Sequence, residues 1–287
     1  MSHTTMELPF PAPAIYRAWT EESLVKQWLS PCARVNIKEG VFELWGAALP
    51  EAPVEAATRL LGCRENEMLE FAWSVRGGEG TVRLELTERR ESTHLSLRTE
   101  LPPMLIGMAH PHDFFTTALE NLRRLLAGGT PAWFPEYGGA TQGDPSLAIE
   151  IEASCEQVFD ALVNPAQLNR YIGPDAKVDP QPGGEYTYGW KGGGPMKILD
   201  IVPNRKLSFN WHYEHENEQM PETVVSWTLE GSEGRTRLTL IHSGFAKKRP
   251  GDDYRSGWMK YMNEMKSMLE LGAMWTAARL EGSEGDY

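Results

Sequence analysis

His242 is the residue whose type and position suggest chemistry most directly. Apolar and polar residues alternate before it, which places Leu238, Leu240 and His242 on one face of a strand. An imidazole titrates near neutral pH, so an inward-facing His242 could contact a bound ligand or act as a general acid or base. The simpler role, which we expect, is structural, with the imidazole bonded to a backbone carbonyl or to Tyr188.

Aromatic rings and methionines recur at spacings that place them beside this histidine. Strand-like alternation puts the aromatic residues of three stretches on inward faces, and helical spacing groups others near the C-terminus. Rigid rings leave gaps that flexible methionines fill, a composition suited to an adaptable apolar pocket. The candidate ligand-binding residues are therefore Tyr186, Tyr188, Trp211, Trp227, His242, Trp258, Met262 and Met265. The alternative is that these side chains form an ordinary core.

Motifs of known catalytic or cofactor chemistry are missing from the sequence. It contains no GxSxG, HExxH, Walker loop or CxxC pair. The three cysteines (Cys32, Cys63 and Cys155) are too few for a disulfide framework. We therefore predict no catalytic residue, no metal and no cofactor, and leave open whether the chain is an enzyme.

The elements that must position the candidates become visible through an internal repeat. Ile15–Thr20 and Val158–Val163 share a pattern at a spacing of 143 residues. The same spacing pairs Trp28 with Tyr171, Val82–Leu86 with Val225–Leu229, and Leu122 with Met265. Solenoid repeats have periods of about 20–50 residues. The sequence therefore predicts two similar domains in tandem.

The second copy shows its elements more clearly. Leu147–Glu152 alternates as a half-buried strand does, and Ser154 with Gln157 forms a capping box that opens a short helix. A second helical turn follows Asn164-Pro165. We expect strands over Glu185–Trp190, Met196–Val202, Lys206–Tyr213, Thr223–Leu229 and Arg235–His242, and a helix from about Tyr254 to Ala278.

The first copy repeats this order, with helical turns at 13–29, strands near 41–46, 58–62, 68–75, 80–87 and 93–100, and a helix at about 112–127. Antiparallel strands curl readily, and one long amphipathic helix covers the concave face. The predicted fold class is α+β, with two tandem helix-grip domains, each a curved antiparallel sheet around a long C-terminal helix. We assign residues 1–128 to the first domain, 129–145 to a linker docked through Trp133, Phe134 and Tyr137, and 146–287 to the second domain.

Composition limits the partners. The formal net charge of −12 argues against nucleic acid or an anionic membrane, both of which attract basic surfaces. Neither a signal peptide nor an apolar run of about 18 residues is apparent. We expect a cytoplasmic protein.

Five separated motifs, in order, resemble a known family. They are Val158–Leu162 with Tyr171–Pro174, Pro182–Tyr186, Pro203–Trp211, Thr236–Phe245 and Gly257-Trp258. Together they resemble START-like domains of the SRPBCC superfamily, and in particular bacterial homologues of the C-terminal domain of the heat-shock-protein-90 ATPase activator. The resemblance covers about residues 147–270. The first copy matches it weakly, with Lys38-Glu39-Gly40 in place of Pro182-Gly183-Gly184.

The resemblance implies a cavity between sheet and long helix that holds small apolar ligands. The leading hypothesis is therefore that the second domain binds a small hydrophobic molecule and the first is a diverged scaffold. The enzymatic alternative is a polyketide-type cyclase or aromatase, for which His242 and Tyr188 are the available inward pair. A third possibility is a chaperone-associated protein-interaction module. The activator's own chaperone role depends on a further N-terminal domain that this chain does not show, so that role is not carried over.

Overall fold

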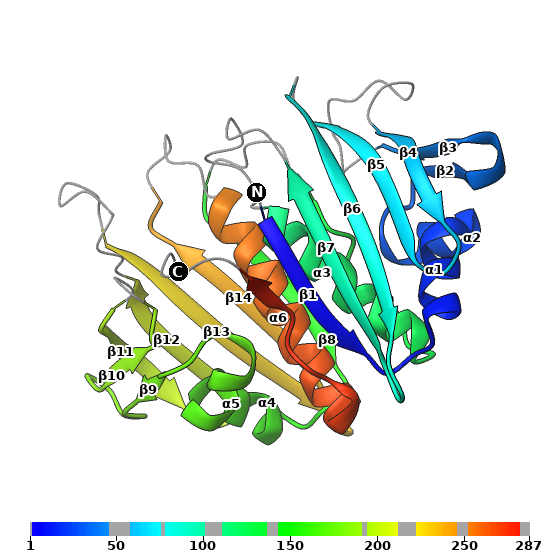
Figure 1. Cartoon of the computed structure of the whole chain (residues 1–287). Helices are drawn as coiled ribbons and strands as arrows, with labels where there is room; N and C mark the ends of the chain where they lie inside the picture. The colour runs from blue at the N-terminus through cyan, green and yellow to red at the C-terminus, as the bar shows by residue number, and fades with distance from the viewer. Residues whose placement is uncertain are drawn as a thin grey trace. The chain divides into compact units, whose positions relative to one another are not determined.

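The computed structural model of the chain describes residues 2–45, 58–75, 78–100, 111–136, 143–190, 194–211, 222–245 and 252–281. The chain forms two compact units. Unit 1 contains Met1–Gly139 and Thr276–Ser283, and unit 2 contains Ala140–Trp275 and Glu284–Tyr287. Each unit has an antiparallel sheet and a long helix, so the predicted tandem α+β organisation is confirmed (Figure 1).

Unit 1 is built around the helix α3 and a curved antiparallel sheet (Figure 1). The strands of this sheet follow the order β15-β1-β7-β6-β5-β4, and β2 and β3 form a separate pair. In chain order the elements are β1 (Ser2–Leu8), α1 (Ala12–Thr20), α2 (Glu22–Trp28), β2 (Ala33–Asn36), β3 (Val41–Leu44), β4 (Thr58–Arg64), β5 (Met68–Val75), β6 (Gly78–Glu88), β7 (Thr93–Glu100), α3 (Pro111–Leu126) and, from the end of the chain, β15 (Arg279–Glu281).

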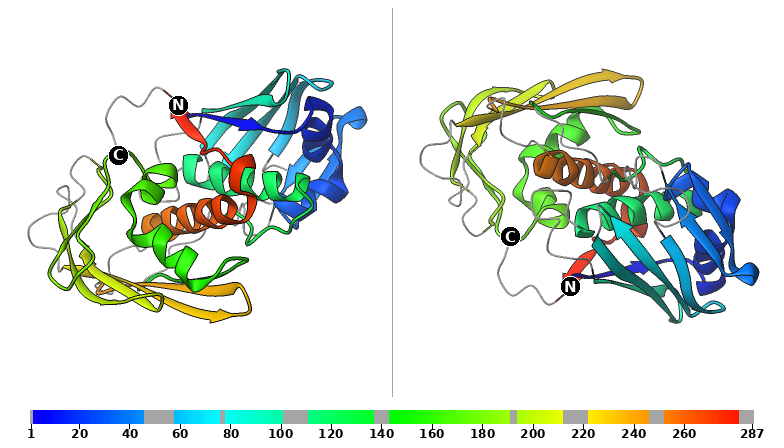
Figure 2. Two further views of the ribbon diagram at one scale, coloured as in Figure 1. Left: turned by 90° about the horizontal axis from the view of Figure 1, so that it is seen from below. Right: turned by 90° about the horizontal axis from the view of Figure 1, so that it is seen from above.

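Unit 2 repeats this plan in a sheet of order β8-β14-β13-β12-β11-β10-β9. Figure 2 shows this sheet curving around the side on which α4, α5 and α6 lie. The elements are β8 (Ser146–Ile151), α4 (Cys155–Val163), α5 (Pro165–Tyr171), β9 (Lys177–Val178), β10 (Glu185–Thr187), β11 (Met196–Val202), β12 (Lys206–Trp211), β13 (Thr223–Ser232), β14 (Arg235–Ser243) and α6 (Asp252–Leu271).

Strand register defines which residues of the two units are equivalent. Trp73 lies opposite Gly80 in unit 1 as Trp211 lies opposite Thr223 in unit 2. Both units also interrupt the register at the same place, between Leu60 and Gly62 in one and between Ile198 and Asp200 in the other. A bulge bends a strand locally, so a shared bulge bends both sheets at one point. The repeat seen in the sequence is therefore a repeat of structure down to individual pairs.

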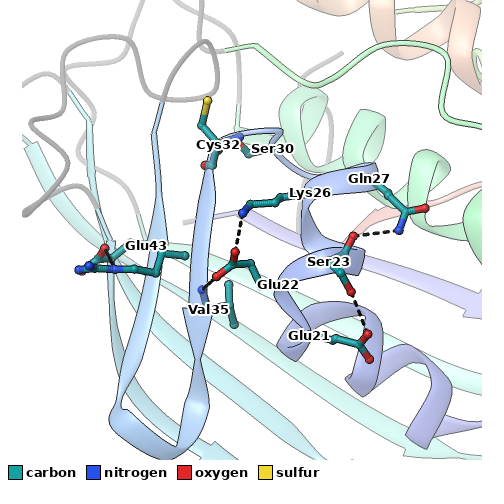
Figure 3. A network of polar contacts seen from close by, with 10 residues as sticks. Glu21, Glu22, Ser23, Lys26, Gln27, Ser30, Cys32, Val35 and Glu43 are labelled. Atoms are coloured by element: carbon teal, nitrogen blue, oxygen red, sulfur yellow. Dashed lines mark hydrogen bonds and ion pairs between the residues drawn. The ribbon is translucent and has the colours of Figure 1, made fainter.

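Short helices before the sheet are fixed by polar contacts at their ends. The predicted capping box of α4 is confirmed, because Ser154 Oγ accepts from the Gln157 amide and the Gln157 side chain accepts from the Ser154 amide. In unit 1, Glu22 of α2 bonds Lys26 one turn later and also accepts from the Val35 amide of β2 (Figure 3). These contacts lower the pKa of Glu22, with the Lys26 hydrogen bond as the largest cause. One carboxylate thus ties a helix to the neighbouring strand pair.

The end of the chain differs from the sequence expectation. The helix expected to reach Ala278 ends at Leu271, where Gly272 takes a left-handed conformation with φ of 55° and a short 3-10 turn follows. Residues 279–281 then form β15, which pairs antiparallel with β1. The structure therefore places Thr276–Ser283 with unit 1, whereas the sequence division assigned them to the second domain.

The structure also differs from the sequence prediction at strands that are short or whose alternation of apolar and polar residues is interrupted. The β1 strand was not predicted, because Thr4 and Thr5 are both buried and interrupt a simple alternation. The strand expected over Glu185–Trp190 ends at Thr187, and Tyr213, the expected end of another, lies outside the described residues. In the expected linker, Trp133 is held to α3 by a bond of 2.7 Å from Asn121 Nδ2 to its carbonyl, and Tyr137 lies outside the described residues.

Candidate ligand-binding site

The eight candidate residues all lie in the interior of unit 2. Tyr186 belongs to β10 and Tyr188 follows it, Trp211 ends β12, Trp227 lies in β13 and His242 in β14, and the other three belong to α6. None of these side chains is more than 5% exposed. Ring contacts join most of them: Trp211 lies 5.3 Å from both His242 and Trp258, and 6.3 Å from Tyr188, between ring centroids. The sheet and α6 therefore bring the predicted set together.

His242 is held as a neutral imidazole by two partners. Trp258 Nε1 donates to His242 Nδ1 at 3.1 Å, and because an indole nitrogen can only donate, Nδ1 carries no proton. The proton of a neutral ring then resides on Nε2, which lies 2.9 Å from Thr223 Oγ1 and donates to it. Both ring nitrogens are thus engaged inside the protein. The hydrogen-bond partners differ from the backbone carbonyl or Tyr188 expected from sequence.

Tyr188 packs against a second tyrosine instead. Its ring meets that of Tyr186 edge-on at 5.2 Å between centroids, and Tyr186 donates to Leu162 O at 2.8 Å. Tyr171 donates to the adjacent carbonyl, Ala161 O, at 2.9 Å. Both carbonyls belong to the last turn of α4, where the helix itself supplies no donor. Burial raises the pKa of all three phenols, so they remain protonated donors at neutral pH.

Four indoles of unit 2 divide into two kinds. Trp258 has the His242 acceptor, and Trp190 Nε1 donates to Ile172 O at 3.2 Å. Trp211 Nε1 and Trp227 Nε1 are buried and meet no acceptor among the described residues. A buried N–H without an acceptor costs about 1–3 kcal/mol relative to one that is bonded. Among the described residues, these two indoles are therefore unused donors of unit 2, Ser267 Oγ is a third, and Trp19 Nε1 of unit 1 is likewise buried without an acceptor.

Comparison with known proteins places the chain in a family. The model of the family "Activator of Hsp90 ATPase homolog 1-like protein" matches twice, over residues 9–127 and 152–270. The chain belongs to this family. The two matches coincide with the two repeats, so both units are family domains, and the tandem resemblance inferred from sequence is confirmed. No curated protein matches the chain.

Three solved structures are similar to the chain at low identity. The Aha1 dimer from Colwellia psychrerythraea is 24% identical, covering 45% of this chain and 98% of that one, with a TM-score of 0.40. An HSP90 activator from Plasmodium falciparum is 20% identical over 44% of this chain and 96% of that one, with a TM-score of 0.39. DynU16, from the dynemicin biosynthetic locus, is 16% identical over 93% of this chain and 95% of that one, with a TM-score of 0.31.

The two family domains of this chain differ at the candidate positions. The residues of unit 1 equivalent to the eight candidates, in the same order, are Phe42, Leu44, Trp73, Leu84, Thr99, Phe115, Leu119 and Leu122. Gly80 stands where Thr223 stands, so the whole His242–Thr223–Trp258 network is missing from unit 1. Trp73 instead contacts Phe114 and Phe115, at 5.2 Å between centroids. At the positions of this network unit 1 has Gly80, Thr99 and Phe115, so unit 2 is the more polar of the two at these positions.

Sequence reasoning missed several residues that complete the site. Thr223 binds the imidazole, and the rings of Phe245 and Tyr254 lie 4.6 and 4.9 Å from it. The ring of Tyr261 stacks on Trp190 at 5.5 Å. A signal for two of these was present, because Tyr254 and Tyr261 stand four and three residues from Trp258 and so share a helix face with it. Thr223 gave no such signal, since its position opposite Trp211 depends on strand register.

No helix in the described ranges is long and apolar enough to cross a membrane.

Proposed function

We propose that unit 2 binds a small, largely apolar molecule between its sheet and α6, and that unit 1 is a scaffold that has lost this capacity. The observation that carries the proposal is the difference between equivalent positions. A domain that needs only a stable core can fill it with hydrocarbon, as unit 1 does with Leu44, Leu84 and Phe115. At the equivalent positions unit 2 has Tyr188, Trp227 and Trp258, whose hydrogen-bonding groups stabilise a fold less than apolar groups of the same shape unless all are satisfied.

The unused donors indicate what the molecule presents. A carbonyl, ether or phenolic oxygen on the ligand would accept from Trp211 Nε1 or Trp227 Nε1, while the rest of the molecule contacts rings. Met262 and Met265 lie on the same buried face of α6, and their flexible side chains can rearrange around a guest. The ligand class is therefore an apolar molecule with few hydrogen-bond acceptors.

The arrangement favours binding over acid–base catalysis. A general acid or base must exchange a proton with its substrate. Both nitrogens of His242 are engaged by Trp258 and Thr223, and the ring of Tyr188 packs against that of Tyr186. A cyclase-type reaction that uses this pair would first have to break these bonds. We therefore assign His242 a structural role in holding Trp258 and β13.

A protein-interaction role is the alternative suggested by the family description, and a cytoplasmic chaperone would be its partner. Such a role calls for a contiguous apolar surface. In the described part of unit 2 the exposed large apolar side chains of the sheet are Leu199 and Val202 on β11 and Ile241 on β14. Two strands, β12 and β13, separate them, so they form no continuous patch within the sheet. The cytoplasmic location itself stays a prediction.

A matched pair of substitutions tests the proposal. Trp211→Phe removes the N–H and keeps an aromatic ring, and Trp73→Phe does the same at the equivalent position of unit 1. A panel of apolar probes with and without a carbonyl is titrated by fluorescence and by native mass spectrometry. We expect carbonyl probes to bind the wild-type chain at one site and to lose about tenfold in affinity in Trp211→Phe only. Equal losses in both variants, or no binding of any probe, would refute the proposal.

A further inference from the structure

The first strand of each repeat, β1 in unit 1 and β8 in unit 2, has one side that faces no other repeated strand of its sheet, and the two units cover this side in different ways. In unit 2 the edge strand is β8, and side chains of α6 cover its backbone. Lys266 Nζ donates to Glu150 O at 2.7 Å, and Glu270 Oε1 accepts from the Glu152 amide at 2.9 Å. Arg255 Nη1 reaches Ser146 O at 3.3 Å. These bonds occupy three of the backbone groups with which a further strand could pair.

Unit 1 lacks this cover at the equivalent positions. Ala127 stands where Glu270 stands, and Pro9, which has no amide hydrogen, stands where Glu152 stands. Arg123 is the equivalent of Lys266 and Glu7 the equivalent of Glu150, but the two do not meet directly. Thr276 lies between them: Arg123 Nη2 donates to Thr276 O at 2.6 Å, and Thr276 Oγ1 donates to Glu7 O at 3.2 Å.

The C-terminal segment then follows the rest of the edge as a strand. Arg279, Leu280 and Glu281 lie opposite Thr5, Thr4 and His3. The Glu281 carboxylate accepts from Thr5 Oγ1 at 3.2 Å and lies 3.7 Å from His3 Nδ1. Edge strands pair readily with extended peptides through backbone bonds, and side-chain pockets supply the selectivity. The segment thus makes the contacts that a bound peptide would make.

We propose that the side of β1 opposite β7 is a binding site for an extended peptide, which pairs there as an additional strand. Residues 276–281 occupy this site in the structure, and an external peptide can replace them. The recognised peptide carries a hydroxyl residue at the Thr276 position, which bridges Arg123 and Glu7, and a carboxylate five residues later, which meets Thr5 and His3. This site lies in unit 1 and is independent of ligand binding in unit 2. Because the internal segment is tethered, it competes at high effective concentration and keeps the site closed.

The test weakens the binding of residues 276–281 to β1 by two substitutions and adds the same six residues as a free peptide. The labelled hexapeptide Thr-Ala-Ala-Arg-Leu-Glu is titrated into the wild-type chain and into a Thr276→Val/Glu281→Gln chain, with binding followed by fluorescence anisotropy. We expect the double variant to bind the peptide at least tenfold more tightly than the wild type. Peptides with valine in the first position or glutamine in the last should bind the double variant more weakly than the native sequence, and this control compares peptides on one and the same protein.

Two further substitutions compare the equivalent helix positions. Added to the double variant, Arg123→Met should weaken peptide binding, and Lys266→Met should leave it unchanged. The proposal is overturned if a folded double variant binds the peptide no better than the wild type, or if the valine and glutamine peptides bind as well as the native sequence. Self-association of the double variant in place of peptide binding would overturn it as well, because the opened edge would then pair with a second copy.

Discussion

Alkaline pH should destabilise unit 2 far more steeply than unit 1. Tyr171, Tyr186 and Tyr188 are fully buried, and desolvation raises the pKa of each phenol above its ordinary value of about 10. Above pH about 10 the unfolded chain loses these protons while the folded chain keeps them. The unfolded state then binds fewer protons, so the free energy of unfolding falls as pH rises, and the contribution is fully present below that pH.

The magnitude follows from the number of phenols. Each tyrosine that stays protonated only in the folded state lowers stability by about 1.4 kcal/mol per pH unit, so three lower it by about 4 kcal/mol per pH unit. Against a domain stability of about 5–15 kcal/mol, unit 2 should unfold within a few pH units above 10. In unit 1, burial, with a smaller contribution from Cys63, raises the pKa of Tyr16 to about 12, so we expect a slope of about 1.4 kcal/mol per pH unit there.

Urea unfolding at a series of alkaline pH values, followed by circular dichroism, measures both slopes, and phenolate absorbance shows when the buried tyrosines titrate. Tyr186→Phe keeps the ring and removes one ionisable group, so the slope of the unit 2 transition should fall by about one third. At neutral pH the same variant should lose about 1–3 kcal/mol, because Leu162 O loses its donor. An unchanged slope in Tyr186→Phe, or equal slopes in the two units, would refute the reasoning.

Three further outcomes are expected from thermal or urea unfolding. Gly189→Ala should lower the free energy of unfolding by several kcal/mol, because the new Cβ would lie 2.1 Å from Pro174 O. Gly183 has the same φ of 80° but open space around it, so Gly183→Ala should lower it by only about 1–2 kcal/mol. His242→Leu should lower stability by about 2–5 kcal/mol, because Trp258 Nε1 and Thr223 Oγ1 lose their hydrogen-bond partner. Ile241→Thr, a control at the exposed neighbouring position, should lower it by less than about 1 kcal/mol. Similar losses in both variants would contradict a stabilising role of the His242 hydrogen bonds. Lys266→Met should lower stability by about 1–2 kcal/mol, because Glu150 O loses its hydrogen-bond donor. The ion pair of Lys206 with Asp200 is exposed, so Lys206→Met should lower stability by less than about 1 kcal/mol.

The sequence was sufficient to predict the duplication, the family and the fold. These depend on local patterns, such as the capping box at Ser154 and the alternation from Leu238 to His242, which the structure repeats. Pro182-Gly183-Gly184 was recognisable as a motif of the family. The structure gives the physical reason for its last glycine, because a Cβ on Gly184 would lie 2.1 Å from Asp179 O. The burial of all eight candidate residues follows from the same periodicity.

The partners of the buried polar groups could not be predicted in this way. Which group meets His242 depends on the register that sets Thr223 opposite Trp211 and on the rotation of α6 that brings Trp258 to Nδ1. The bond from Tyr186 to Leu162 O joins elements 24 residues apart. The pairing of β15 with β1 connects segments near the two ends of the sequence. β15 has only three residues, which is too short for an alternation of apolar and polar residues to predict a strand.

The placement of β15 makes the two halves of this polypeptide unequal as fragments. A fragment that stops near residue 140 retains every repeated element of the first half but lacks the strand that pairs with Ser2–Leu8. We expect this fragment, whose β1 edge is open, to bind the free hexapeptide of residues 276–281. A fragment from about 140 to 275 carries Lys266 and Glu270 and should stay monomeric in solution. The second half is thus expected to stand alone, whereas the first needs residues 279–281, from the far end of the sequence, to complete its sheet.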